Sequence, residues 1–73
     1  MNNIQLLDVV ALTDALPDAQ LPPGQVGTVV ERLADGVFEV EFSDNSGRTY
    51  AMAAVPASKL MVLRHDPAEI AGS

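Results

Sequence analysis

The chain has 73 residues, a net charge of −6 from ten acidic and four basic residues, and no cysteine. This length permits one domain with one modest core, and the absence of cysteine excludes disulfides, thiolate metal ligands and a cysteine nucleophile. Hydrophobic residues make up 48% of the chain against 19% charged residues, which suggests that another chain covers part of the surface. The alternative is that alanine, small and only mildly apolar, inflates the apolar count.

The N-terminal residues predict no export signal. Residues 1–4 contain no basic stretch and no long apolar run, unlike a signal peptide. The longest fully apolar stretch, residues 51–56, is far shorter than the ~20 residues of a membrane span. We therefore expect a cytoplasmic protein without membrane contact.

Five short segments rich in β-branched and aromatic residues predict five strands. Residues 14–24 between the first two contain three prolines and predict a loop, because prolines at that density continue neither a ladder nor a helix. Asp35-Gly36 and residues 44–47 predict tight turns, and residues 56–59 have the length of one 3₁₀ turn. The predicted strands cover residues 6–13, 25–33, 36–43, 48–55 and 60–63.

The order of these elements predicts an all-β fold, a small five-stranded SH3-like barrel over residues 1–65 with a long first loop and a 3₁₀ turn before the last strand. Curling the sheet on itself would hide its edges, whereas the alternative, an open β-sandwich, normally needs more strands. Residues 66–73 are expected to form a flexible tail. The expected core comprises Val10, Leu12, Val29, Phe38, Val40, Phe42, Met52 and Leu60.

Three glycines are expected to have structural roles. Gly24 lets the first loop turn, and Gly36 supplies the positive φ of a hairpin turn. Gly27 lies inside the second strand, where glycine often marks a bulge or the close approach of another backbone.

The fourth strand loses the alternation of polar and apolar residues. Residues 51–55 carry no charge on either face, and a strand that is apolar on both faces is normally covered on both. We expect Tyr50, Met52 and Ala54 to face the core, and the opposite face to be covered by the chain's own loop or tail or by another subunit. The predicted protein interface comprises Ala51, Ala53 and Val55 on this strand, Met61 and Leu63 on the last strand, and Glu39 and Glu41 as an acidic rim.

The residue types give no support for catalysis. His65 is the only histidine, and without a second histidine or a cysteine neither a triad nor a zinc site is expected. Residues 44–46 lack the spacing of a calcium loop, and no glycine-rich loop with a lysine is available for phosphate. Glu39 and Glu41 are interpreted as a solvated face or an acidic binding face. We expect no enzyme, no cofactor and no metal.

Charge separates the possible partners. The basic residues are scattered along the chain, and a net charge of −6 repels a polyanion, which argues against nucleic acid. The same field would speed docking onto a basic protein. The four bases are Arg32, Arg48, Lys59 and Arg64.

Several segments carry a resemblance to known families. The spacing Gly24-x-x-Gly27-x-Val29 resembles the loop-into-strand element of KOW-type barrels. Taken with the rest of residues 4–64, the pattern resembles the small bacterial family catalogued as domain of unknown function 4926. This resemblance implies an SH3-like barrel without an established activity, so no catalytic residues are carried over; it also implies a candidate antitoxin, because such genes often lie beside toxin genes. The segments are 7–12, 24–31, 38–42, 47–51 and 60–63.

These observations favour a non-catalytic protein-binding module, such as an antitoxin or immunity protein that masks a basic toxin. The first alternative is a self-assembling structural subunit of a larger complex, which would make the protein a homo-oligomer. The second is a nucleic-acid accessory module of KOW type. The sequence does not identify the partner.

Overall fold

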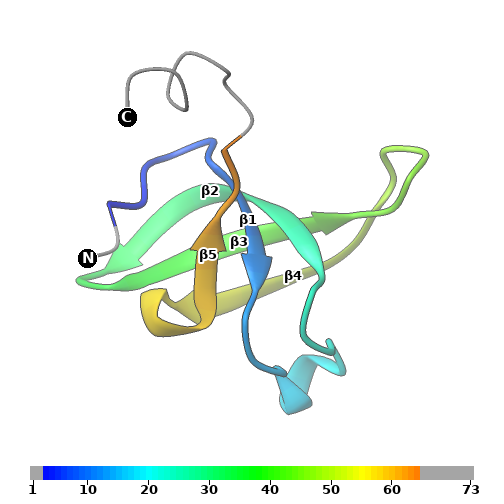
Figure 1. The fold of residues 1–73 in the computed structure, drawn as a ribbon, viewed down its shortest axis with the longest axis horizontal. Helices are drawn as coiled ribbons and strands as arrows, with labels where there is room; N and C mark the ends of the chain where they lie inside the picture. Colours follow the sequence, from blue (N-terminus) through cyan, green and yellow to red (C-terminus); the bar gives the residue numbers. More distant parts are fainter. Residues whose placement is uncertain (1–2, 65–73) are drawn as a thin grey trace.

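A computed structural model describes residues 3–64, in which five antiparallel strands form one sheet with the order β4-β3-β2-β1-β5 (Figure 1). The all-β prediction is confirmed, and no helix in this range is long and apolar enough to cross a membrane. Residue 65 and the predicted tail over residues 66–73 lie outside the described residues. The elements are β1 Val9–Leu12, the 3₁₀ turn η1 Pro17–Ala19, β2 Val26–Ala34, β3 Val37–Ser43, β4 Thr49–Pro56, the 3₁₀ turn η2 Ala57–Lys59 and β5 Leu60–Val62.

The sheet bends strongly but does not close. In Figure 1, β1 and β5 run across the direction of β3 and β4. Among the described residues, β4 pairs only with β3 and β5 pairs only with β1, so the prediction of a closed barrel is wrong. η2 redirects the chain between β4 and β5, so that β5 runs across the direction of β4 and its three residues pair with β1 (Figure 1). Both outer strands therefore present an open edge.

The core lies on the inner face of the bent sheet. Every predicted core residue except Met52 is buried; the Met52 side chain is 52% exposed. Burying each large aliphatic or aromatic side chain contributes roughly 1.5–3 kcal/mol, so this cluster is the main source of stability. Its members are Val10, Leu12, Leu21, Val29, Phe38, Val40, Phe42, Val55 and Leu60.

The side chains of β4 face the opposite way from the prediction. Val55 is fully buried, and Ala51 and Ala53 pack against the core cluster, so these three residues form the inner face instead of a free interface. Tyr50, which was expected inside, is 47% exposed. The larger side chains point outward because the inner positions of β4 lie opposite bulky core residues: Ala51 pairs with Phe42, and Val55 with Phe38. Small side chains fit there at native packing density.

The first loop supplies the cover for that inner face. Leu16 and Leu21 exchange two backbone hydrogen bonds of 2.8 and 3.1 Å around η1, and Leu21 is only 5% exposed. Leu16 and Ala19 pack against the core together with Ala53. The chain's own first loop, one of the covers expected for Ala51, Ala53 and Val55, therefore lies over this face.

Three glycines hold positions that a side chain would crowd or strain. A Cβ atom on Gly27 would lie 2.6 Å from the Val40 Cγ1 and 2.8 Å from the Glu41 carbonyl oxygen. The ladder is regular at Gly27, and β2 shifts register only beyond Val29, so close approach explains this glycine and a bulge does not. Gly36 has φ +71° in the β2–β3 turn, as expected for a hairpin of this kind. The first-loop turn at Gly24 also has positive φ.

Candidate protein interface

The outer face of the sheet, opposite the core cluster, joins acidic and apolar side chains. On β3 and β4, Glu41 pairs with Met52 and Glu39 pairs with Ala54. Paired residues on neighbouring strands share one face of the sheet, so both predicted rim acids lie beside exposed residues of β4. Glu39 and Glu41 are half-buried. The structure thus replaces Ala51, Ala53 and Val55 by Met52 and Ala54 as the exposed neighbours of the acids.

The negative charges of Glu39 and Glu41 are not balanced by any residue that pairs with them. Glu39 pairs with Glu31 on β2 as well as with Ala54, and Glu41 pairs with Thr28 and Met52. Like charges directly opposite each other on a sheet are destabilising, and no basic residue stands directly opposite either β3 acid. The outer face therefore has a local negative field that a cationic side chain would relieve.

The other predicted interface residues lie at the far end of the outer face. Met61 on β5 pairs with Ala11 on β1, which also pairs with Val26 on β2. Met61 is 52% exposed and Val26 is 45% exposed, whereas Leu63 is half-buried and donates its N–H to the Val9 carbonyl at 2.8 Å. Met61 is therefore exposed on the outer face, but three strands, β3, β2 and β1, lie between it and Met52.

The backbone direction along β4 follows from its ladder. The N–H of Ala57 donates to the carbonyl of Gly36 at 2.7 Å. Gly36 and Ala57 are therefore a hydrogen-bonded pair, one step beyond the last pair of the β3–β4 ladder, Val37 and Pro56. Hydrogen-bonded pairs alternate along an antiparallel ladder, so the odd-numbered residues of β4 point their backbone groups at β3. The N–H and C=O groups of Met52 and Ala54 therefore point out of the sheet, at its open edge.

The β4 edge lacks the devices that normally protect an edge strand. Natural edges are short, charged, bulged or interrupted by proline. β4 has eight residues, none of them charged, and its proline is the last residue. The register shift lies at the start of the strand, where Tyr50 is the extra residue between the Ser43 and Phe42 pairs. Between residues 51 and 55 the edge is regular and open, unlike the three-residue edge of β5.

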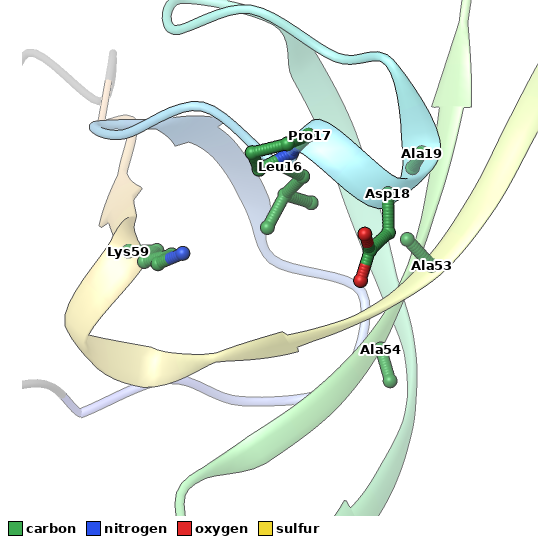
Figure 2. Close-up of a pocket in the computed structure, with 7 residues that line it drawn as sticks. All are labelled: Leu16, Pro17, Asp18, Ala19, Ala53, Ala54 and Lys59. Carbon is green, nitrogen blue, oxygen red and sulfur yellow. The ribbon is translucent and has the colours of Figure 1, made fainter.

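A pocket of about 310 Å³ lies against this edge, between the first loop, β4 and η2. Figure 2 shows the Asp18 carboxylate and the Lys59 side chain on opposite sides of the pocket, with Leu16 between them. Asp18 is exposed and Lys59 half-buried. The pocket can therefore surround an apolar group with a charge of each sign at its ends. Its lining residues are Leu16, Pro17, Asp18, Ala19, Ala53, Ala54 and Lys59.

A second hollow of about 320 Å³ lies at the other end of β4, next to the β3–β4 turn. There the Tyr50 hydroxyl donates a hydrogen bond to the Gln25 side-chain oxygen. The neighbouring Asp44 carboxylate accepts hydrogen bonds from the Ser46 hydroxyl at 2.8 Å and from the backbone N–H groups of Ser46 and Arg48. The Ser46 hydroxyl bond and then the Arg48 bond lower the pKa of Asp44 from its ordinary value of 3.8. This geometry organises the turn.

The polar side chains of the described range form neither a metal-ligand cluster nor an unsatisfied buried site. No group of three or more His, Cys, Asp or Glu side chains in residues 3–64 is placed to hold a metal ion, and every side-chain polar atom buried there has a hydrogen-bond partner. His65 lies outside the range. Arg32, one of the scattered bases, forms an exposed ion pair of 3.0 Å with Asp35. What the described surface offers is an edge, a pocket and an acidic face.

Sequence reasoning missed the residues that make β4 distinctive at its edge. The expectation that Tyr50, Met52 and Ala54 face the core is wrong, because β4 is apolar on both faces and its own sequence does not show which face lies inward. The partner strand could have corrected this: Phe38, Val40 and Phe42 occupy the inner face of β3, and the pairing partners of that row must lie on the same face. Leu16 and Leu21 could also have been found, as leucines standing alone in a proline-rich loop.

One comparison with known proteins gives a match. The model of the family described as Domain of unknown function (DUF4926) matches residues 6–62, a range that runs from the turn before β1 to the end of β5. No curated protein and no solved structure matches the chain.

Proposed function

The chain belongs to the family described as Domain of unknown function (DUF4926), and we propose that it is a non-catalytic protein-binding module whose partner is a basic protein. An antitoxin or immunity protein that masks a basic toxin would work in this way. The observation that carries the proposal is the acidic outer face beside the exposed, uncharged edge of β4. A partner with cationic side chains next to apolar ones would match both features.

Three physical arguments support this function. The net charge of −6 accelerates encounters with a cationic protein. The cross-strand pair of Glu31 and Glu39 leaves a negative site that a cation would stabilise. Met52, more than half exposed, is an adaptable apolar side chain of the type enriched in interfaces. Together they favour a partner that is basic and partly apolar.

The proposal includes an SH3-like arrangement of the strands with an open edge. Its support is the strand order β4-β3-β2-β1-β5, the long first loop and the 3₁₀ turn before β5. In this arrangement the first loop, η2 and β4 meet around one pocket, which gives the partner a concave feature next to the flat sheet.

Self-assembly is the alternative that one observation favours, because the uncharged edge of β4 could pair with the same edge of a second copy. Nucleic acid has weaker support. Arg32 is engaged by Asp35, and acidic residues dominate the outer face.

The test is affinity purification from the native host at low salt, with wild type and Met52→Lys as baits. We expect wild type to retain a stable basic protein, and Met52→Lys to retain far less, because the added ammonium group would neutralise the neighbouring Glu41 and repel a cationic partner. Thr13→Lys is the control, since it adds the same charge to an exposed position directly after β1. Equal recovery by both variants, or recovery of the bait protein alone, would contradict the proposal.

A further inference from the structure

The open edge of β4, the adjoining pocket and the acids of β3 lie side by side, and their geometry suggests one mode of binding. We propose that β4 accepts an extended basic segment of a partner protein as an additional antiparallel strand. This inference rests on the proposed function and specifies how the partner is held. Its parts are the backbone groups of Met52 and Ala54, the carboxylates of Glu39 and Glu41, and the pocket beside Ala53.

The backbone groups provide the affinity. The N–H and C=O groups of Met52 and Ala54 point away from β3, and no other described segment forms a backbone hydrogen bond with them. An incoming strand would satisfy all four groups, as in other cases of β-strand addition. Pro56 has no N–H, so the paired region ends there. At its other end, the extra residue Tyr50 interrupts the regular strand.

The side chains provide the selectivity. Residues of the incoming strand that stand opposite Met52 and Ala54 share the outer face with Glu41 and Glu39. Because Ala54 is small, a lysine or arginine opposite it can extend across the strand toward Glu39. That carboxylate already faces Glu31 on its other side, so a cation there relieves a repulsion as well as forming an ion pair. The ligand is therefore basic at alternate positions.

The intervening residue of the ligand meets the pocket. A side chain opposite Ala53 points to the inner side of the sheet, where Ala53 and Leu16 line the cavity of about 310 Å³. An apolar side chain fits between Leu16 and Ala53, with Asp18 and Lys59 at the rim of the pocket (Figure 2). The expected ligand pattern is thus basic, apolar, basic.

The same charges argue against a second copy of the chain as the occupant. A symmetric pairing of two β4 edges would place both sets of Glu39 and Glu41 on one continuous outer face. β4 contains no basic residue to oppose them, and each copy carries a net charge of −6. Like charges across an interface disfavour the complex, so the occupant is a segment of another protein.

The experiment uses the intact protein and the blocked peptide Lys-Val-Lys-Val-Lys-Val-Lys, with amide hydrogen exchange followed by NMR. We expect the peptide to slow exchange at Met52 and Ala54, the two amides that point out of the edge. Methylating the backbone nitrogens of the lysines should weaken binding about tenfold or more, because those N–H groups pair with β4. Methylating the valine nitrogens, which point to the far side, is the matched control and should change little.

Two further measurements test the backbone of β4 and the role of charge. Ala54→Pro removes one outward N–H and should weaken binding about tenfold, whereas Ala54→Ser keeps the N–H and should bind as wild type. Glu39→Gln should reduce binding, and the peptide with glutamate in place of lysine should not bind. Since the methylated peptides leave the protein unchanged, the test stands even where Ala54→Pro does not fold.

The outcomes separate this inference from the function on which it rests. Peptide binding that protects other amides and leaves Met52 and Ala54 unaffected would overturn strand addition while leaving a basic-partner module in place. Equal binding of the glutamate peptide, or failure of the lysine peptide to bind, would count against both. Concentration-dependent protection of the same amides without peptide would assign the edge to a second copy and overturn the inference.

Discussion

The two faces of β4 are made of similar residues but have opposite environments. On the inner face, Val55 is fully buried, and Ala51 and Ala53 pack against the core. On the outer face, Met52 and Ala54 remain exposed beside the acids of β3. Composition does not separate the two sets, since each is apolar. The difference comes from β3, whose bulky row of phenylalanine and valine side chains dictates which residues of β4 lie inward.

The comparison shows how a strand that is apolar on both faces can be covered on only one. The first loop closes over the inner face through Leu16 and Leu21. The chain has no comparable segment over Met52 among its described residues. An uncovered apolar position costs roughly 25 cal/mol per Å² relative to burial, so the outer face is where an external partner gains most.

The largest expected effect is truncation on the inner face. Val55→Ala should lower the free energy of unfolding by about 2–3 kcal/mol, because it leaves a cavity in a fully buried site. Met52→Ala on the outer face of the same strand should change it by less than about 0.5 kcal/mol. Urea denaturation of both variants measures the difference. Similar losses for the two variants would mean that both faces of β4 contribute equally to the free energy of unfolding.

Gly27 and Thr28 extend the comparison to β2. Gly27→Val should destabilise the protein by roughly 1–3 kcal/mol through overpacking, because its Cβ would approach the Glu41 carbonyl and the Phe42 ring to within 2.8 and 2.9 Å. Thr28→Val, which places the same valine side chain on the outer face, should hardly change the free energy of unfolding. The midpoints of urea unfolding give the answer, and a Gly27→Val protein as stable as wild type would show that the backbone has room to move.

A charge placed on each face gives a smaller but sharper contrast. Ala53→Glu should destabilise by about 1–2 kcal/mol, because its carboxylate meets the core side of the sheet. This replaces the expectation that the position lies on a free interface. Ala54→Glu, one residue later, should cost less, roughly 0.5 kcal/mol, because its carboxylate stays in water and meets only the repulsion of Glu39 on the neighbouring strand. Thermal melts at neutral pH measure the stability of the two variants. A larger loss for Ala54→Glu than for Ala53→Glu would mean that Ala53 faces solvent, as predicted from the sequence.

Much of the fold could be predicted because its signals are local. The Asp35-Gly36 turn, the alternation of β3 and the proline-rich loop each depend on neighbouring residues, and all three lie where expected. The positive φ of Gly36 was predictable for the same reason. Strand boundaries differ from the predicted ones by at most three residues. β1 begins at Val9 because Leu7 adopts φ 71° in the preceding turn.

The missed features depend on contacts between distant segments. The burial of Leu21 requires the first loop to fold over β4, and the exposure of Met52 requires the register of β3 against β4. Closure of the sheet likewise depends on the relative direction of β4 and β5, which no single segment determines. The acids Glu39 and Glu41 were correctly placed on the face opposite the core, because alternation along one strand is sufficient for that.

The smallest expected effect concerns the turn from which β4 starts. Asp44 accepts three hydrogen bonds from Ser46 and Arg48, and these bonds lower its pKa below 3.8 in the folded protein. A carboxyl group with a lowered folded-state pKa adds stability above its unfolded pKa, and that stability is lost as the pH falls through the folded pKa. Asp44→Asn should therefore be slightly less stable than wild type at neutral pH, and the difference should vanish in acid.

Urea unfolding of wild type and Asp44→Asn at neutral pH and in acid measures this difference. Asp14→Asn, which removes the same charge from the first loop, is the control for the change in net charge. A deficit of Asp44→Asn that stays constant with pH would show that the side-chain geometry, and not the ionised carboxylate, holds the turn. If the deficit follows the titration, the charge at Asp44 helps to fix the hairpin turn that leads into β4.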